Sequence, residues 1–140
     1  MESTNKTLLG SDSAKLAEAA AAVLIEKKAL DLRLYNVGEE NPITDYYINV
    51  TGRSLTQVAA LADEVVFKLS EQGVDNPRVE GKRGNAWILV DYGNVIINVF
   101  DKESREFYNL DRLMPAGSEK DISAIVAMVD AKLKINKTEE

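Results

Sequence analysis

The sequence contains no cysteine and no histidine, and its 140 residues include a single tryptophan, Trp87. Without cysteine the chain has no disulfide framework, no thiolate nucleophile and no cysteine-ligated zinc site. Without histidine it lacks the most frequent general base and the most frequent metal ligand, so a Ser-His-Asp triad is impossible. These absences exclude several large classes of catalytic and metal-binding sites.

Long apolar runs and targeting signals are lacking as well. The longest apolar run, residues 19–25, is rich in alanine and far too short to cross a bilayer. The first fifteen residues have neither the basic segment and apolar core of a secretory signal nor the arginine content of an import peptide. We therefore expect a cytoplasmic protein without a membrane anchor.

The composition is that of one soluble globular domain, with 45% hydrophobic and 29% charged residues. The formal charge is 17 − 23 = −6 and the isoelectric point is near 4.8. An acidic surface is poorly suited to gripping nucleic acid by its phosphates, because that binding relies on lysine and arginine. A basic protein partner would suit the chain better.

The first part of the chain predicts one helix followed by two strands. The helix is expected to follow Ser11 or Ser13 as its cap and to run through about Lys28. The strands are expected over 31–36 and 44–51, where apolar and β-branched residues are frequent. The first of these strands places three leucines on one side: Leu30, Leu32 and Leu34.

The strongest local signal is Ser54-Leu55-Thr56-Gln57, which matches a capping box. Apolar residues then recur at helical spacing, and Gly73 stands where a left-handed residue commonly ends a helix. This segment predicts a helix over residues 55–72.

A strand over residues 78–80 and a hairpin of strands 86–91 and 95–100 are expected next, joined by turn residues Asp91 to Asn94. Asp101 then caps a short helix that ends near Asn109, and residues 110–115 are less regular. Ser118 and Asp121 open a last helix over residues 118–133. The residues from 134 onward are expected to fray. The element order predicts an α/β (α+β) fold, a single mixed β-sheet with helices packed on it.

Three carboxylates, Asp45, Asp91 and Glu80, invite comparison with an acid–base or metal set. Each stands beside a turn or a strand end without a spacing signature, so capping and solvation explain them better. The same holds for Gly117-Ser118 with Asp121, which faintly resembles a nucleotidyl-transfer loop, and for the short turn 81–84, which no helix follows. We expect no catalytic residue, no metal and no cofactor.

The hairpin around Trp87 has two possible structures. Trp87, Leu89 and Asp91 share one face of the first strand, while Ile88 and Val90 share the other. Neither strand has one polar and one apolar side. Either helices cover both faces, which composition favours, or one face is an apolar patch kept for a partner.

Four segments in order resemble the Iojap family of ribosomal silencing factors. They are Thr44–Ser54, Val79–Gly81, Trp87–Gly93 and Arg105–Leu113. The resemblance covers roughly residues 12–114. It divides the chain into a flexible tail (1–11), an Iojap-like domain (12–116) and a C-terminal helical extension and tail (117–140).

This resemblance implies a translational repressor rather than an enzyme. Family members bind the large ribosomal subunit at ribosomal protein L-fourteen and sterically block joining of the small subunit. The fold implied is nucleotidyltransferase-like without the catalytic residues. Two alternatives remain open: a nucleotide-binding or nucleotidyl-transfer enzyme on the same fold, and homodimerisation through the same apolar face.

The resemblance also implies which residues meet the partner. Trp87 maps onto the family's interface tryptophan, with Leu89, Asp91 and Tyr92 as companions. Further candidates are Phe100, Tyr108 and the segment Arg112-Leu113-Met114. The sequence departs from the family pattern at three positions, where the family usually has aspartate, histidine and tryptophan: Asn94, Asn98 and Met114.

Overall fold

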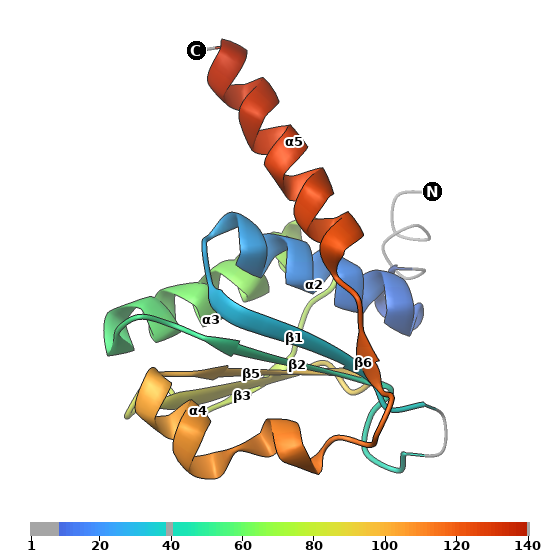
Figure 1. Ribbon diagram of the computed structural model, residues 1–140, viewed down its shortest axis with the longest axis vertical. Helices are drawn as coiled ribbons and strands as arrows, with labels where there is room; N and C mark the ends of the chain where they lie inside the picture. Colours follow the sequence, from blue (N-terminus) through green and yellow to red (C-terminus); the bar gives the residue numbers. More distant parts are fainter. Residues whose placement is uncertain (1–8, 39–40, 140) are drawn as a thin grey trace.

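Strands from both halves of the chain form a single six-stranded sheet (Figure 1). The computed structural model describes residues 9–38 and 41–139, with side chains as far as Ile135. The strand order is β3–β4–β5–β2–β1–β6, and all neighbours are antiparallel except the parallel pair β2–β5. The strands are β1 (Leu30–Asn36), β2 (Tyr46–Thr51), β3 (Arg78–Glu80), β4 (Trp87–Asp91), β5 (Val95–Phe100) and β6 (Glu119–Lys120). The predicted mixed sheet is confirmed.

Two helices, α2 (Ser13–Glu26) and α3 (Leu55–Glu71), cover one face of this sheet. Figure 1 shows both helices on the same side of the strands. Their apolar stripes meet alternate residues of the central strands, because side chains of a strand alternate between its two faces. The resulting core includes Leu16, Leu24, Ile48, Val58, Leu61, Val65, Ile88, Val90, Ile97 and Val99, each no more than 2% exposed.

Helix α3 begins as the capping box predicts. The Ser54 hydroxyl oxygen accepts the N–H of Gln57 at 3.1 Å. The Gln57 side chain accepts the N–H of Arg53, one residue earlier than the reciprocal bond of a standard box. The helix ends before Gly73, whose φ of 87° confirms the left-handed position expected there.

Helix α2 starts from a different cap than predicted. Asp12, rather than Ser11 or Ser13, accepts the N–H of Lys15, at 3.1 Å. The Ser13 hydroxyl instead donates to Asp45 at 2.5 Å. A carboxylate and a hydroxyl are both good caps, so local sequence alone could not choose between adjacent residues.

A bulge in β1 changes which leucines face the core. Leu30 pairs with Thr51 but Arg33 pairs with Asn49, so β1 contains one more residue than β2 in this interval. Asp31, with a φ of 46°, absorbs the irregularity. The predicted alignment of Leu30 with Leu34 is therefore wrong: Leu34 is buried, whereas Leu30 is 37% exposed.

The opposite face of the sheet carries α4 (Lys102–Tyr108) and the short 3-10 helix η1 (Leu110–Leu113). Asp101 caps α4 as predicted, accepting the N–H of Ser104 at 2.8 Å. Asn109, in the left-handed conformation, separates α4 from η1. Figure 1 shows this segment below the sheet, away from α2 and α3.

The chain after Pro115 differs from the predicted helix over 118–133. Ser118 lies in a turn and donates its hydroxyl to the Pro115 carbonyl at 2.6 Å. Residues of β6 then pair with β1, with Glu119 opposite Tyr35. A two-residue strand has no detectable periodicity, which is why the sequence did not indicate it.

The last helix, α5 (Ser123–Glu139), begins later than expected and continues through the segment predicted to fray. Val129 is buried, Ile125 packs against the core, and Lys132 Nζ lies 3.4 Å from a Glu26 carboxylate oxygen on α2. Beyond this contact the helix runs away from the sheet (Figure 1). Within the described ranges, none of the helices has the length and hydrophobicity to span a membrane.

The turn between β3 and β4 depends on Gly81. Its φ is 93°, and a Cβ there would lie 2.0 Å from the Trp87 carbonyl oxygen. We expect Gly81→Ala to lower the free energy of unfolding by about 2 kcal/mol or more, because neither the conformation nor the space admits a side chain. Gly84→Ala, in the same turn but with nothing within 4 Å, is the control and should have little effect in urea unfolding. Equal losses in the two variants would contradict this assignment.

Candidate functional site

The sheet face opposite α2 and α3, called the α4 face here, carries polar and aromatic side chains instead of an aliphatic core. Pairing across β4, β5 and β2 aligns Trp87 with Phe100 and Thr51, and Leu89 with Asn98 and Asn49. These rows lie on the side of the sheet covered by α4 and η1. Aromatic, aliphatic and amide side chains are therefore held next to one another on rigid strands.

Trp87 points onto the α4 face and not into the main core. Its ring packs against those of Phe100 and Tyr108, with centroid distances of 5.1 Å and 4.7 Å. Its indole Nε1 donates a hydrogen bond to Asn98 Oδ1 at 3.0 Å. The side chain is half-buried, so one part of the ring is held by the protein while another part meets solvent.

Two buried amides continue this hydrogen bond across the sheet. Asn98 Nδ2 donates to Asn49 Oδ1 at 3.1 Å, and Asn49 Nδ2 donates to Asp111 Oδ1 at 3.2 Å. Asn49 and Asn98 are 0% and 1% exposed. We call the series Trp87, Asn98, Asn49 and Asp111 the amide chain.

Asp111 joins η1 to α4 and to the sheet by accepting four hydrogen bonds. Arg105 Nε donates to one carboxylate oxygen at 2.7 Å. The other oxygen accepts from an Arg105 terminal nitrogen at 3.3 Å, the Tyr35 hydroxyl at 2.7 Å and Asn49. A carboxylate bound by a guanidinium fork and further donors is among the stronger polar contacts in proteins.

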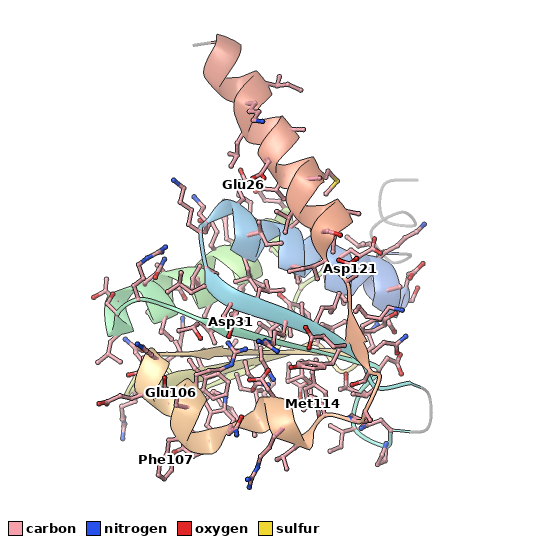
Figure 2. All side chains as sticks on the ribbon, in the orientation of Figure 1. Glu26, Asp31, Glu106, Phe107, Met114 and Asp121 are labelled. Carbon is pink, nitrogen blue, oxygen red and sulfur yellow. The ribbon has the colours of Figure 1, made fainter. Side chains whose placement is uncertain are left out.

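Arg105 is itself almost fully buried, and each of its three side-chain nitrogens donates a hydrogen bond. Besides Asp111, it donates to the Thr51 hydroxyl at 2.9 Å and lies 3.7 Å from Asp31 in the β1 bulge. Figure 2 shows Asp31 on the strand directly above this region. The guanidinium thus connects α4 with η1, β1 and β2.

The same contacts set the charge states of the cluster. Burial tends to raise the pKa of Asp111, but hydrogen bonds from Arg105, Tyr35 and Asn49 outweigh it and lower the pKa below the ordinary value. Burial and the hydrogen bond to Asp111 raise the pKa of Tyr35, so its hydroxyl stays protonated and donates. The site is a fixed polar cluster at neutral pH.

Comparison with known proteins assigns the chain to a family. The family described as "Ribosomal silencing factor during starvation" (RsfS) matches residues 10–140. The chain belongs to the RsfS family. This confirms the resemblance drawn from the four segments, and the match extends through α5.

Individual RsfS proteins and solved structures agree with this assignment. Ribosomal silencing factors of Halalkalibacterium halodurans and Bacillus subtilis are 34% and 35% identical, covering 71% and 67% of this chain and 85% and 80% of their own lengths. A chloroplastic Iojap protein of Zea mays is 29% identical over 69% of this chain and 40% of its own. A crystal structure from Chromobacterium violaceum superposes with a TM-score of 0.71 at 31% identity, covering 79% of this chain and 90% of that one.

The structure places the predicted RsfS interface residues in different environments. Leu89 is half-buried on the α4 face, and Asp91 accepts the Gly93 N–H at 2.7 Å while pairing with Arg78 at 3.4 Å. Phe100 is completely buried beneath Trp87, so it supports the tryptophan and does not itself reach solvent.

Helix α4 and the segment after it supply the most exposed apolar groups of this face. Phe107 is 81%, Leu113 64% and Tyr108 48% exposed, while Arg112 is exposed and Met114 half-buried. Phe107 packs edge-on against Tyr108 at 5.0 Å, and Figure 2 shows it pointing away from the sheet. We call Trp87, Tyr108 and Phe107 the aromatic patch.

Sequence reasoning did not identify Phe107 as a site residue, and it missed Asn49 and Asp111 of the amide chain. Asn49 and Asn98 did give a signal, because each interrupts an otherwise apolar strand at a position that proved to be buried. Buried amides need partners, and those partners lie far away in the sequence. Arg105 and Asp111 belong to one of the four segments that carry the resemblance, but no local pattern indicated that they form a buried ion pair.

The three carboxylates weighed for catalysis do not form one group. Glu80 and Asp91 both pair with Arg78, at 3.6 Å and 3.4 Å, whereas Asp45 bonds to Ser13 at the start of α2. In the described part of the chain, no group of three or more acidic residues could hold a metal ion.

A hollow of about 430 Å³ does lie beyond the carboxyl ends of the parallel strands β2 and β5, a usual place for ligands in α/β sheets. Its charges are mixed, since Asp31 and Glu106 line it together with Arg53 and Lys102. Arg105, which also lines the hollow, is already bound to Asp111 and Thr51. This arrangement does not favour a triphosphate.

Acid should weaken the structure through Asp111. Its lowered pKa means that ionised Asp111 stabilises the fold above the unfolded-state value near 4, and that this stability is lost as the pH falls through the folded-state pKa. We expect Asp111→Asn to lower the free energy of unfolding at pH 7 by about 3 kcal/mol, because buried Arg105 loses its counter-charge.

Urea unfolding from pH 7 downward measures this effect. The curves for the native protein and the Asp111→Asn variant should converge as the pH falls. Asp130→Asn, on the exposed side of α5, serves as the control and should change stability at pH 7 by less than about 0.5 kcal/mol. Parallel curves for the native protein and Asp111→Asn would refute the role of Asp111.

Tyr92 lies on the core side of the hairpin, away from the aromatic patch. Its hydroxyl is buried without a hydrogen-bond partner among the described residues, and burial raises its pKa to about 12. We expect Tyr92→Phe to raise the free energy of unfolding by about 1 kcal/mol, because an unpaired buried hydroxyl is costly. Tyr35→Phe, which loses the bond to Asp111, should destabilise instead. A loss of stability in Tyr92→Phe would show that the hydroxyl has a partner.

Proposed function

We propose that this RsfS-family chain binds the large ribosomal subunit at ribosomal protein L-fourteen, through the aromatic patch, and sterically blocks joining of the small subunit. It acts by binding and not by catalysis, and needs no cofactor. The exposure of Phe107, at 81%, beside a half-buried tryptophan is the observation that carries the proposal.

The patch has the composition of an interaction surface. Tryptophan and tyrosine are enriched among residues that dominate binding energy, because they bury a large area with few rotatable bonds. Trp87 and Tyr108 are already packed together at 4.7 Å, so little ordering is needed when a partner binds. Phe107 packs on Tyr108 and extends this pair into a contiguous apolar group, and contiguous exposed apolar groups are typical of interaction sites.

The surroundings of the patch suit a basic partner. A shallow hollow of about 550 Å³ lies along α4, lined by Glu103, Ser104, Glu106, Phe107 and Tyr108. A lysine or arginine side chain placed there would meet two carboxylates and the face of an aromatic ring. The net charge of −6 would accelerate encounter with a basic protein.

The layers of the fold support steric exclusion. The aromatic patch lies on the α4 face, while α2, α3 and the projecting α5 lie on the other side of the sheet (Figure 1). The 17 residues of α5 span about 25 Å. When a partner is bound at α4, the two-helix layer and α5 therefore point away from that partner. A small subunit approaching the same site would collide with them.

Phe107→Ser tests the docking surface with little risk to the fold. Because the side chain is mostly exposed, we expect a change in stability within about 0.5 kcal/mol but a loss of co-sedimentation with purified large subunits. Phe67→Ser is the matched control, since Phe67 is 51% exposed on α3, on the other side of the sheet. Equal co-sedimentation of the native protein and both variants would rule out the patch as the docking site.

A further inference from the structure

The two parts of the aromatic patch come from different elements but share one buried support. Trp87 belongs to β4, whereas Phe107 and Tyr108 belong to α4. The amide chain starts at the Trp87 indole and ends at Asp111, which holds Arg105 of α4. We propose that Asn98 and Asn49 are positioning residues that fix the Trp87 ring relative to α4 in the geometry needed for docking. This inference rests on the proposed docking function.

The amide chain has a single possible direction. Ionised Asp111 only accepts hydrogen bonds, so Asn49 must turn its Nδ2 toward it. Asn49 then presents Oδ1 to Asn98, and Asn98 must use its own Nδ2 for that bond. Only Asn98 Oδ1 remains for the indole, which can only donate. The charge of Asp111 thereby fixes the orientation of both amides. As a result, an acceptor, Asn98 Oδ1, faces the Trp87 N–H.

Burial makes departures from this arrangement costly. Asn49 and Asn98 are 0% and 1% exposed, so water cannot replace a lost partner. If the indole rotated away, Asn98 Oδ1 would be left buried and unpaired. A half-exposed tryptophan would otherwise sample several rotamers, and the chain confines it to the one that packs on Phe100 and Tyr108.

The other part of the patch depends on the same anchor. Helix α4 has seven residues, which is too short to be stable without tertiary contacts. Its buried anchor is Arg105, held by Asp111 and Thr51, and the exposed Phe107 and Tyr108 follow directly. The amide chain therefore orients both contributors to the patch at once.

Asn98→Leu breaks the amide chain at its centre and keeps the same number and branching of side-chain heavy atoms. The single tryptophan gives one indole N–H resonance, which reports on this bond without interference. We expect that resonance to shift and its hydrogen exchange to accelerate, and affinity for large subunits to fall by about five- to tenfold. Ile97→Val is the control: Ile97 is buried on the opposite face, so a loss of general stability should leave the resonance and the affinity unchanged.

Asp111→Asn tests the direction of the hydrogen bonds in the amide chain. It is also the alternative test if Asn98→Leu does not fold. It does not touch Trp87, yet removing the charge frees both amides to reverse, so the indole resonance should move or split. An unchanged resonance in either variant would overturn the inference. So would a shifted resonance with native affinity in Asn98→Leu. Failure of the native protein itself to bind large subunits would instead refute the proposed function, while the resonance would still test the chain.

Discussion

The ion pair between Arg105 and Asp111 is the contact on which the α4 face depends. Arg105 is only 7% exposed, and an unpaired guanidinium at that depth would be strongly unfavourable. Its bonds to Asp111 and Thr51 tie two short helical segments to the central strands. Neither α4 nor η1 has the length to persist alone. The main core under α2 and α3 is conventional by comparison, and its stability comes from burying aliphatic side chains.

Much of the fold could be predicted from local sequence. Helix α3 combines a capping box, a regular apolar stripe and a terminal glycine, and it appears within one residue of its predicted end. The hairpin of β4 and β5 was equally clear. The errors fall where long-range contacts decide: the bulge at Asp31, the choice of Asp12 as a cap, and the two-residue β6, which exists only because β1 offers it a partner.

The candidate site was predictable only in part. The resemblance singled out Trp87. The alternation of side chains along the strand placed Trp87 on the face opposite Ile88 and Val90, but composition could not decide whether helices cover that face. In the structure the Trp87 ring is half-buried, and its indole N–H is hydrogen-bonded to Asn98. Trp87 and Asn98 are 11 residues apart, but the next two bonds of the amide chain join residues that are 49 and 62 positions apart. No local sequence pattern indicates contacts over such distances.

The short strands at both edges of the sheet have a consequence for self-association. β3 has three residues and β6 has two, so neither edge offers a long row of free N–H and C=O groups. A second copy could not extend the sheet by strand addition over any useful length. If a second copy paired instead through the aromatic patch that we propose as the docking surface for the ribosome, the two associations would be mutually exclusive.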